Sequence, residues 1–342
     1  MSRPDRSDGD VAKQAATLTA AAGRAAPHRI TRLAGGRNNQ VYRLDLVEGM
    51  PLVLKRYFTD ARDGRDRLAA EWSFISRAWD EGLRNIPQPL ACDSSSHAAL
   101  YAFLPGRKLR PKDVTAAHVW AAADFIAAIN ARPWPEATAA SEACFSIDDH
   151  LAIVERRLAR LASLEPHAPR SDQARAFVAR SLRPAWDQVK AAVMAECRPL
   201  DFDPSRRLAA AECRLSPSDF GFHNALVDDD GRLTFLDFEY AGRDDPAKLA
   251  TDFVCQPEVP IPSTLRGEWR ERLMSGGVLD AAALARSTLL MDACRIKWAC
   301  IMLNDFLPLG DARRAFADAD ERDRRCAVQL AKAARAIDEI AA

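Results

Sequence analysis

Short apolar groups separated by turn residues dominate the part of the chain from Arg29 to Phe58. Runs of this length are typical of β-strands, and the breaks at Gly35-Gly36 and Glu48-Gly49 carry residues that favour turns. The apolar positions are Ile30 and Leu33, then Val41, Tyr42, Leu44 and Leu46, and then Leu52, Val53 and Leu54. This pattern predicts three strands of a small antiparallel sheet.

Helical spacing of apolar residues follows the predicted sheet. Between Arg65 and Glu81 the apolar residues recur every three or four positions, and Gly82 comes next as a residue that commonly ends a helix. We therefore expect one amphipathic helix packed on the sheet. Ahead of the sheet, the alanine-rich stretch Asp10 to Ala26 predicts a short helix, whereas residues 1–8 show no apolar periodicity and are expected to be loose.

A second change of pattern falls at Pro105-Gly106, a turn that ends the apolar run Ala98 to Leu104. From Pro111 onward the pattern is mostly helical, except in the segment Leu215 to Tyr240. The predicted fold is α+β and bilobal, with a small N-terminal antiparallel sheet lobe that carries one helix and a larger, mainly helical C-terminal lobe. The expected divisions are an N-terminal extension with a helix at 1–28, an N-lobe at 29–104 and a C-lobe at 105–342.

Composition and charge narrow the class of protein. Hydrophobic residues make up 48% and charged residues 28% of the 342 positions, as in ordinary globular proteins. Lys plus Arg and Asp plus Glu both number 48, so no overall field favours nucleic acid or an anionic membrane as a partner. The eight cysteines include no C-x-x-C pair and are expected to be reduced thiols. No uncharged run reaches the roughly 18 to 20 residues of a membrane span, and no signal-peptide pattern opens the chain, which favours a cytoplasmic protein.

Candidate chemistry lies in the segment Leu215 to Tyr240, where Asp219, Asn224 and Asp237 recur at spacings that phosphoryl transfer requires. A hydroxyl that attacks a phosphate needs a carboxylate to orient it and accept its proton, a part that Asp219 could take. Mg²⁺ needs oxygen ligands, which Asn224 and Asp237 could supply across a tight hairpin turn at Asp228–Gly231. The alternative is that these are ordinary turn residues.

Lys55 is the candidate for binding phosphate groups. It lies in the apolar run Leu-Val-Leu-Lys, which would place its ammonium inside the protein, where it needs anionic partners such as the phosphates of ATP. Two strands earlier, Gly35-Gly36 forms a turn whose backbone N–H groups could approach phosphates, although a plain hairpin turn is the alternative.

The motifs D-x4-N (Asp219 to Asn224) and D-F-E-Y-A-G (from Asp237) resemble the catalytic and metal-binding loops of the aminoglycoside phosphotransferase and choline kinase superfamily, relatives of the protein kinases. The resemblance spans roughly Arg29 to Phe253. It implies a protein-kinase-like fold with ATP and Mg²⁺ bound in the cleft between the lobes. It further implies that Asp219 is the catalytic base and that Asn224 and Asp237 hold Mg²⁺.

In the N-lobe, the same resemblance implies that Lys55 steadies the α- and β-phosphates and that Glu71 holds Lys55 as its ion-pair partner. Gly35, Gly36 and Asn39 match the loop that covers the nucleotide, and Ala102 and Leu104 would present backbone groups to adenine.

The sequence departs from the family pattern around the catalytic aspartate. Pro217 stands where a His is usual, Gly221 stands where a basic residue is usual, and Phe238-Glu239 follows the metal-binding aspartate. His223 could replace the missing charge, although a single loop histidine is more often structural.

A further departure follows Asp245-Pro246. Lys248-Leu249 replaces the usual Asp there, a part that Asp252 could take at a different spacing.

The predicted function is transfer of the γ-phosphate of ATP to a hydroxyl of a small molecule, namely a sugar, an amino alcohol or an aminoglycoside-like acceptor. One alternative is a nucleotide-binding, kinase-fold scaffold or regulator with little or no transferase activity. Another is a protein kinase, which the short segment between Asp237 and Asp245 disfavours.

Two sets of side chains could recognise the acceptor. A cationic acceptor could use Asp148-Asp149 or Glu239, although these could equally be solvated charges. An anionic or sugar acceptor could use residues of one predicted helix, for which ordinary packing is the alternative. These residues are Arg295, Lys297, Trp298 and Asn304.

Overall fold

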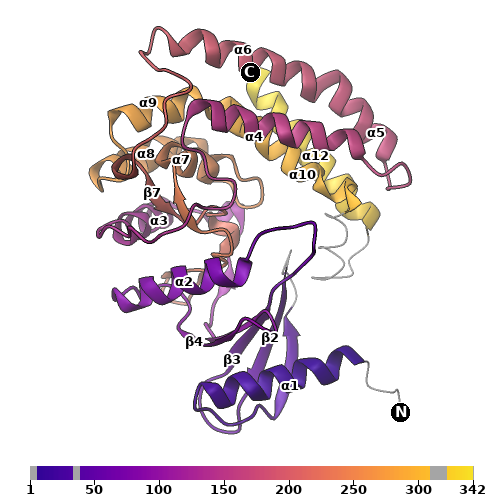
Figure 1. Ribbon diagram of the computed structural model, residues 1–342, viewed down its shortest axis with the longest axis vertical. Coiled ribbons are helices and arrows are strands. Elements are labelled where there is room, and N and C mark those ends of the chain that lie inside the picture. The colour runs from indigo at the N-terminus through magenta and orange to yellow at the C-terminus, as the bar shows by residue number, and fades with distance from the viewer. Residues whose placement is uncertain (1–5, 34–38, 309–321, 342) are drawn as a thin grey trace. The chain divides into compact units, whose positions relative to one another are not determined.

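The computed structural model describes residues 6–33, 39–308 and 322–341 (Figure 1). The glycine turn expected at Gly35 and Gly36 lies outside these residues. Most of the chain divides into two compact units. The first contains Met1–Arg107 and Leu226–Tyr240, and the second contains Lys108–Ala225, Ala241–Ala312 and Asp320–Ala342. The domain boundaries expected at 28 and 104 stay predictions.

An antiparallel sheet of five strands is the centre of the first unit. Its spatial order is β1-β2-β3-β5-β4. The strands are β1 (Arg29–Leu33), β2 (Gln40–Asp45), β3 (Leu52–Arg56), β4 (Pro89–Asp93) and β5 (Ala98–Ala102). The three strands predicted between Arg29 and Phe58 are therefore present, and all neighbouring strands are antiparallel.

Helix α1 (Arg6–Ala21) covers one face of this sheet. Val11, Ala15 and Leu18 recur at helical spacing, are buried, and pack with Leu44 and Leu54 of the sheet in one hydrophobic cluster. The helix begins at Arg6, so the expectation that residues 1–8 are loose was wrong for its last three positions. The buried face of α1 therefore belongs to the same hydrophobic core as the sheet.

Helix α2 (Arg67–Asp80) packs on the other face. Leu54 and Lys55 are neighbours in β3 and therefore point to opposite sides of the sheet. Leu54 contributes to the α1 cluster, whereas Lys55 contacts Glu71 of α2. Asp66 caps the start of the helix by accepting a hydrogen bond from Ala69 N–H, and Gly82, with a φ of 94°, follows its end, as predicted.

A hairpin completes the first unit. Strands β8 (Ala225–Val227) and β9 (Leu233–Phe235) belong to a small sheet with the order β6-β8-β9, in which β6 is Arg107–Lys108. The predicted Asp-Asp-Asp-Gly turn joins β8 to β9, with Gly231 in the left-handed region at a φ of 82°. Phe235 N–H donates to the carbonyl of Asn85, which ties β9 to the segment after α2.

The second unit is mainly helical. Its α-helices are α3 (Ala116–Ile129), α4 (Ile147–Arg160), α5 (Ser171–Phe177), α6 (Arg183–Cys197), α7 (Pro246–Cys255), α8 (Arg266–Ser275), α9 (Ala281–Leu289), α10 (Met291–Met302) and α12 (Arg322–Ala341). Short helical turns lie at Pro111–Asp113, Leu161–Ser163, Ala210–Glu212, Phe222–Asn224, Ser263–Leu265 and Leu303–Phe306, and a π-helical stretch lies at Val178–Leu182. Strands β7 (Arg214–Ser216) and β10 (Gly242–Asp244) form a two-stranded antiparallel ladder.

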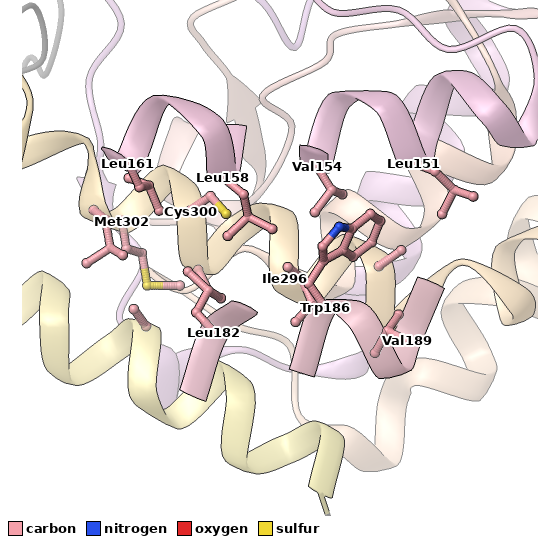
Figure 2. Close-up of a cluster of buried hydrophobic side chains, with 14 of the residues drawn as sticks. Leu151, Val154, Leu158, Leu161, Leu182, Trp186, Val189, Ile296, Cys300 and Met302 are labelled. Atoms are coloured by element: carbon pink, nitrogen blue, oxygen red, sulfur yellow. The ribbon is translucent and has the colours of Figure 1, made fainter. Parts of the chain in front are cut away.

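The main core of the second unit lies where α4, α6 and α10 meet (Figure 2). Leu158, Trp186 and Ile296 come from these three helices and are all buried. Trp186 also satisfies its indole N–H by donating to Glu155 at 2.6 Å, so its burial leaves no polar group unpaired. The predicted α+β fold, with a small sheet region and a larger helical region, is confirmed.

None of the helices among the described residues is both long enough and apolar enough to span a membrane.

We predict that Leu18→Ala lowers the free energy of unfolding by about 2 to 4 kcal/mol, because it leaves a cavity between α1 and the sheet. The matched control is Thr17→Ala, one position earlier on the exposed side of the same helix, with an expected change within about 0.5 kcal/mol. Urea unfolding of the three proteins measures both values. Equal effects of the two substitutions would contradict the packing of α1.

Candidate functional site

Lys55 lies at the centre of a buried cluster of charges in the first unit. Its side chain is 10% exposed, and its Nζ donates to Glu71 Oε2 at 2.6 Å and to Asp237 Oδ1 at 2.5 Å. The structure thus brings together Lys55 from β3, Glu71 from α2 and Asp237 from the segment after β9. The pairing of Lys55 with Asp237 joins residues 182 positions apart.

Helix α2 also fixes the segment that carries Asp237. Phe238 N–H lies 3.4 Å from Glu71 Oε1, and the Phe238 ring stacks on Phe74 with ring centroids 4.5 Å apart. Asp237 itself has a φ of 68°, a conformation that is rare for residues other than glycine and that the surrounding contacts must hold. The Asp237 carboxylate is 35% exposed, so it can reach a ligand while it contacts Lys55.

Glu239 and Asn39 form a second buried contact next to this cluster. Asn39 Nδ2 donates to Glu239 Oε2 at 2.5 Å, and Asn39 Oδ1 accepts from Phe58 N–H at 3.1 Å. Arg67 Nε lies 3.8 Å from the same Glu239 oxygen. Both ends of the Asn39 side chain are thus engaged inside the protein.

The cluster holds more carboxylates than cations. Burial by itself lowers the pKa of Lys55, but Asp237, Glu71 and Glu239 outweigh it and raise that pKa well above its usual value. Burial raises the pKa of Glu71 to about 7, against the opposing effect of Lys55 and with a further increase from Asp237. The carboxylates therefore repel one another even in the presence of Lys55, and an additional cation near Asp237 would stabilise the cluster.

The Asp219 loop in the second unit is held by alternating aromatic side chains. In Asp-Phe-Gly-Phe-His, Phe220 and Phe222 are buried and contact Phe253 of α7, with ring centroids 5.5 Å and 5.2 Å away. Phe253 in turn stacks on Trp269 of α8 at 3.9 Å. The two phenylalanines anchor the loop in the helical core, and the polar residues lie between and after them.

Asp219 and Asn224 lie close together in this loop. Asn224 Nδ2 donates to the backbone carbonyl of Asp219 at 2.9 Å, which leaves the amide oxygen of Asn224 as the atom suited to a metal. The Asp219 carboxylate lies 3.2 Å from His223 Nε2. Ser218, directly before Asp219, has a φ of 69°, so the backbone turns sharply at this point.

Two buried aspartates at the start of α7 hold the segment that follows the first-unit hairpin. Asp245 accepts two hydrogen bonds from Arg286, at 2.9 Å and 2.8 Å, and lies 3.0 Å from His150 Nε2. Asp244 accepts hydrogen bonds from Cys144 N–H and from the ammonium of Lys248. These contacts fix the strand and helix that continue from the D-F-E-Y-A-G motif.

The glycine of that motif has a steric reason. A Cβ at Gly242 would lie 2.5 Å from the backbone N of Ala140 and 2.7 Å from the carbonyl carbon of Ala139. Only glycine allows this close approach of two backbones.

Several residues considered for acceptor recognition are engaged inside the second unit. Lys297 donates to Asp252, and Trp298 Nε1 donates to the same Asp252 oxygen at 3.0 Å. Asp252 thus anchors α7 to α10, which is a structural use of both side chains. Arg295 is paired with Asp292 on its own helix.

The remaining acceptor candidates differ in position. Asp149 accepts from the backbone N–H of Phe145, at the start of α4. Glu239 lies in the buried cluster of the first unit, and Asn304 lies in the short helical turn Leu303–Phe306.

Where Ala102 and Leu104 are expected to contact adenine, the backbone at the end of β5 is partly engaged. Ala102 N–H donates to the carbonyl of Gln88 at 3.0 Å, and Phe103 N–H donates to that of Pro51 at 3.1 Å. Any contact of Ala102 with adenine would therefore use its carbonyl oxygen. Four residues after Ala102, Gly106 has a φ of 140°, and a Cβ there would lie 3.0 Å from the carbonyl oxygen of Val227. The turn ending β5 thus packs tightly on the hairpin.

The sheet with its buried Lys–Glu pair and the helical unit define a protein-kinase-like fold. Comparison with protein families identifies the group within it. The model of the phosphotransferase enzyme family matches residues 29–287, which is more than half of the chain. The protein therefore belongs to this family, whose members include small-molecule kinases.

Solved structures share the fold at low sequence identity. A spectinomycin phosphotransferase in complex with ADP and spectinomycin is 12% identical, covers 96% of this chain and 97% of its own, and has a TM-score of 0.64. For an ethanolamine kinase from Plasmodium vivax the identity is 11%, the coverages are 91% and 83%, and the TM-score is 0.57. A choline/ethanolamine kinase family protein from Mesorhizobium loti is 19% identical, covers 96% of this chain and 98% of its own, and has a TM-score of 0.53. The search of curated proteins gave no match.

We predict a pH-dependent contribution of His150 to stability. Burial by itself lowers the pKa of His150, but Cys144 and Asp245 outweigh it and raise that pKa to about 10. A folded-state pKa above the unfolded value means that the stabilisation is fully present below about pH 6.5 and is lost as the pH rises through about 10. His150→Asn should therefore lower the free energy of unfolding by about 2 kcal/mol at pH 6 and by less at pH 9.

Urea unfolding at the two pH values measures this difference, with His167→Asn at an exposed position as the control. A loss that is the same at both pH values would contradict a charged His150 paired with Asp245.

Proposed function

We propose that this protein transfers the γ-phosphate of ATP to a hydroxyl of a small molecule. The observation that carries the proposal is the buried Lys55 ammonium held between Glu71 and Asp237. A lysine fixed by a helix carboxylate and placed beside a partly exposed aspartate is the arrangement that binds nucleotide phosphates in kinases. Family membership supports the same reaction class.

In this proposal Lys55 contacts the α- and β-phosphates. Glu71 keeps the ammonium in position through the 2.6 Å contact, so the side chain is ordered before the nucleotide arrives. The segment from Gly35 to Asn39 covers the triphosphate, with Asn39 anchored to Glu239. Backbone groups of Ala102 and Leu104 contact adenine.

Asp237 and the amide oxygen of Asn224 are proposed to hold Mg²⁺. No group of three or more His, Cys, Asp or Glu side chains in the described part of the chain could hold a metal by itself. This donor set still fits Mg²⁺, which usually takes one or two protein oxygens and completes its coordination with phosphate oxygens and water. The surplus of carboxylates around Lys55 favours a cation at Asp237. When bound, Mg²⁺ would neutralise charge that develops on the phosphate oxygens.

Asp219 is proposed to act on the acceptor. Its carboxylate orients the attacking hydroxyl and accepts the proton of that hydroxyl as the oxygen bonds to the γ-phosphorus. The bond from the γ-phosphorus to the bridging oxygen of the β-phosphate breaks, and ADP leaves with that electron pair. Phe220 and Phe222 hold the loop that carries Asp219, which limits its movement during transfer.

A small acceptor is favoured over a peptide. Strand β10 begins at Gly242 and α7 begins at Pro246, so few residues separate Asp237 from regular structure. A protein kinase needs a longer activation segment there to order its peptide substrate. We propose a sugar, an amino alcohol or an aminoglycoside-like molecule as the acceptor.

A kinase-fold scaffold that binds nucleotide is the second candidate. It is favoured by Pro217 and Gly221, which stand where the related family usually has a His and a basic residue. Against it, Lys55, Asp219, Asn224 and Asp237 are all present.

We predict ADP release from ATP and Mg²⁺ that depends on an acceptor from pooled sugars, amino alcohols and aminoglycosides. Asp219→Asn keeps the side-chain volume but removes the base, so the rate should fall by about 100-fold or more. A coupled ADP assay measures both proteins, and subdividing the active pool identifies the acceptor. Asp229→Asn, in the exposed hairpin turn, is the matched control. Nucleotide binding without turnover in any pool would favour the scaffold.

A further inference from the structure

We propose that His223 is a positioning residue for Asp219, in which the His223 Nε2–H group donates a hydrogen bond that fixes the orientation of the Asp219 carboxylate. This inference rests on the proposed function, because it assigns a part to His223 in the use of Asp219 as the base. It concerns a side chain that neither the family match nor the motif spacing assigns to the reaction.

The first observation is the contact itself. His223 Nε2 lies 3.2 Å from Asp219 Oδ1, and the His223 side chain is 15% exposed. The two residues are joined by one tight turn, in which Asn224 N–H donates to the Gly221 carbonyl at 3.0 Å. Because Phe220 and Phe222 are anchored in the core, the distance between Asp219 and His223 is set by a rigid piece of backbone.

The second observation is the space that Gly221 provides for the imidazole ring. A Cβ at Gly221 would lie 2.8 Å from His223 Nδ1 and 3.0 Å from its Cε1. Gly221 has a φ of 172°, an extended conformation that any residue can adopt, so the backbone does not require glycine here. The requirement comes from the ring, which lies against the Gly221 Cα.

The third observation is that a buried side chain, that of Gln256, lies beside the same glycine. Gln256 Cγ would lie 3.0 Å from a Cβ at Gly221, and Gln256 is 1% exposed. Its amide is held at the end of α7, where it donates to the Val259 carbonyl and accepts from the N–H groups of Glu258 and Val259. A ring displaced by a larger residue at 221 therefore has little room to return to Asp219.

The fourth observation concerns the other nitrogen of the His223 ring. His223 Nδ1 is buried and has no hydrogen-bond partner among the described residues. A buried N–H without an acceptor is costly, so the ring hydrogen belongs on Nε2, which faces the carboxylate. In this tautomer His223 is a donor to Asp219.

The consequence for catalysis is geometric. A carboxylate held at one oxygen by a buried donor cannot rotate freely about its terminal bond. It therefore presents one orientation to the acceptor hydroxyl, which is the kind of positioning on which transfer rates depend.

The kinetic test compares His223→Gln, His223→Asn and His223→Ala. Gln places its side-chain NH₂ near the position of His Nε2, whereas Asn is too short and Ala has no donor. We expect His223→Ala and His223→Asn to lower kcat by about 10- to 100-fold with unchanged KM values for ATP and Mg²⁺, and His223→Gln to recover most of the loss. Equal losses in all three variants, or a loss confined to KM for Mg²⁺, would overturn the proposal.

A double-mutant cycle tests the role of Gly221. Gly221→Ala should displace the ring and lower kcat by about the same factor as His223→Ala, whereas adding it to His223→Ala should change kcat little. Multiplication of the two effects in the double variant would contradict a shared mechanism.

A spectroscopic measurement tests the contact without any acceptor. Long-range ¹H–¹⁵N spectra of the six histidine rings, with His223→Gln for assignment, should show His223 protonated at Nε2, and Asp219→Ala should shift that signal. A His223 protonated at Nδ1 would overturn the proposal. Absence of transferase activity alongside the expected spectrum would count against the proposed function and not against the contact.

Discussion

The burial of one ammonium among several carboxylates is the interaction on which the first unit depends. Lys55 is one position away from Leu54 in the same strand, and the alternation of β3 sends one into the α1 cluster and the other toward Glu71 and Asp237. A buried charge is tolerated only when it is paired, so sheet, helix and hairpin must meet at Lys55 for the unit to form. The same requirement leaves a surplus of negative charge, because Glu239 also lies nearby. The ion pairs with Lys55 stabilise the cluster, and a further cation would reduce the remaining repulsion between its carboxylates.

The second unit achieves rigidity by a different means. The loop that carries Asp219 contains Phe220 and Phe222, both packed on Phe253, and the polar residues of the loop lie between and after them. Around α7, Asp245 and Asp252 are paired with side chains from α9 and α10. Aromatic packing holds the loop against α7, and the buried ion pairs hold α7 against the helices around it. Asp219 is in this way fixed by residues that need not touch any substrate.

Part of this arrangement could be predicted from the sequence, because strong periodicity and motif order carry it. The apolar run of β3, the helical spacing in α2 and the Asp-Asp-Asp-Gly turn predicted the right elements, and the order of Lys55, Glu71 and Asp237 resembled that of a kinase. Helix α1 was expected, but its packing on the sheet was not. An alanine-rich helix with few large apolar residues gives little indication of which face is buried.

Other features could not be predicted because they depend on contacts between distant positions. Asn39 and Glu239 are 200 positions apart, and nothing in either motif indicates that they hydrogen-bond. The role of Lys297 could not be predicted for the same reason. Only its contact with Asp252 shows that its charge belongs to a core ion pair and not to a ligand-binding site. In the sequence, Gly221 looked like the loss of a basic residue. In the structure, the His223 ring occupies the space that a side chain at position 221 would need.

We propose that the cluster of Lys55, Glu71 and Asp237 binds a nucleotide together with a divalent cation. Isothermal titration calorimetry of the full chain with ATP, in the presence and absence of Mg²⁺, tests it most directly, with Asp237→Asn as the comparison. We expect Mg²⁺ to strengthen ATP binding to the wild-type protein and to have much less effect on the variant. An ATP affinity that is independent of Mg²⁺ in both proteins, or no ATP binding at all, would contradict it.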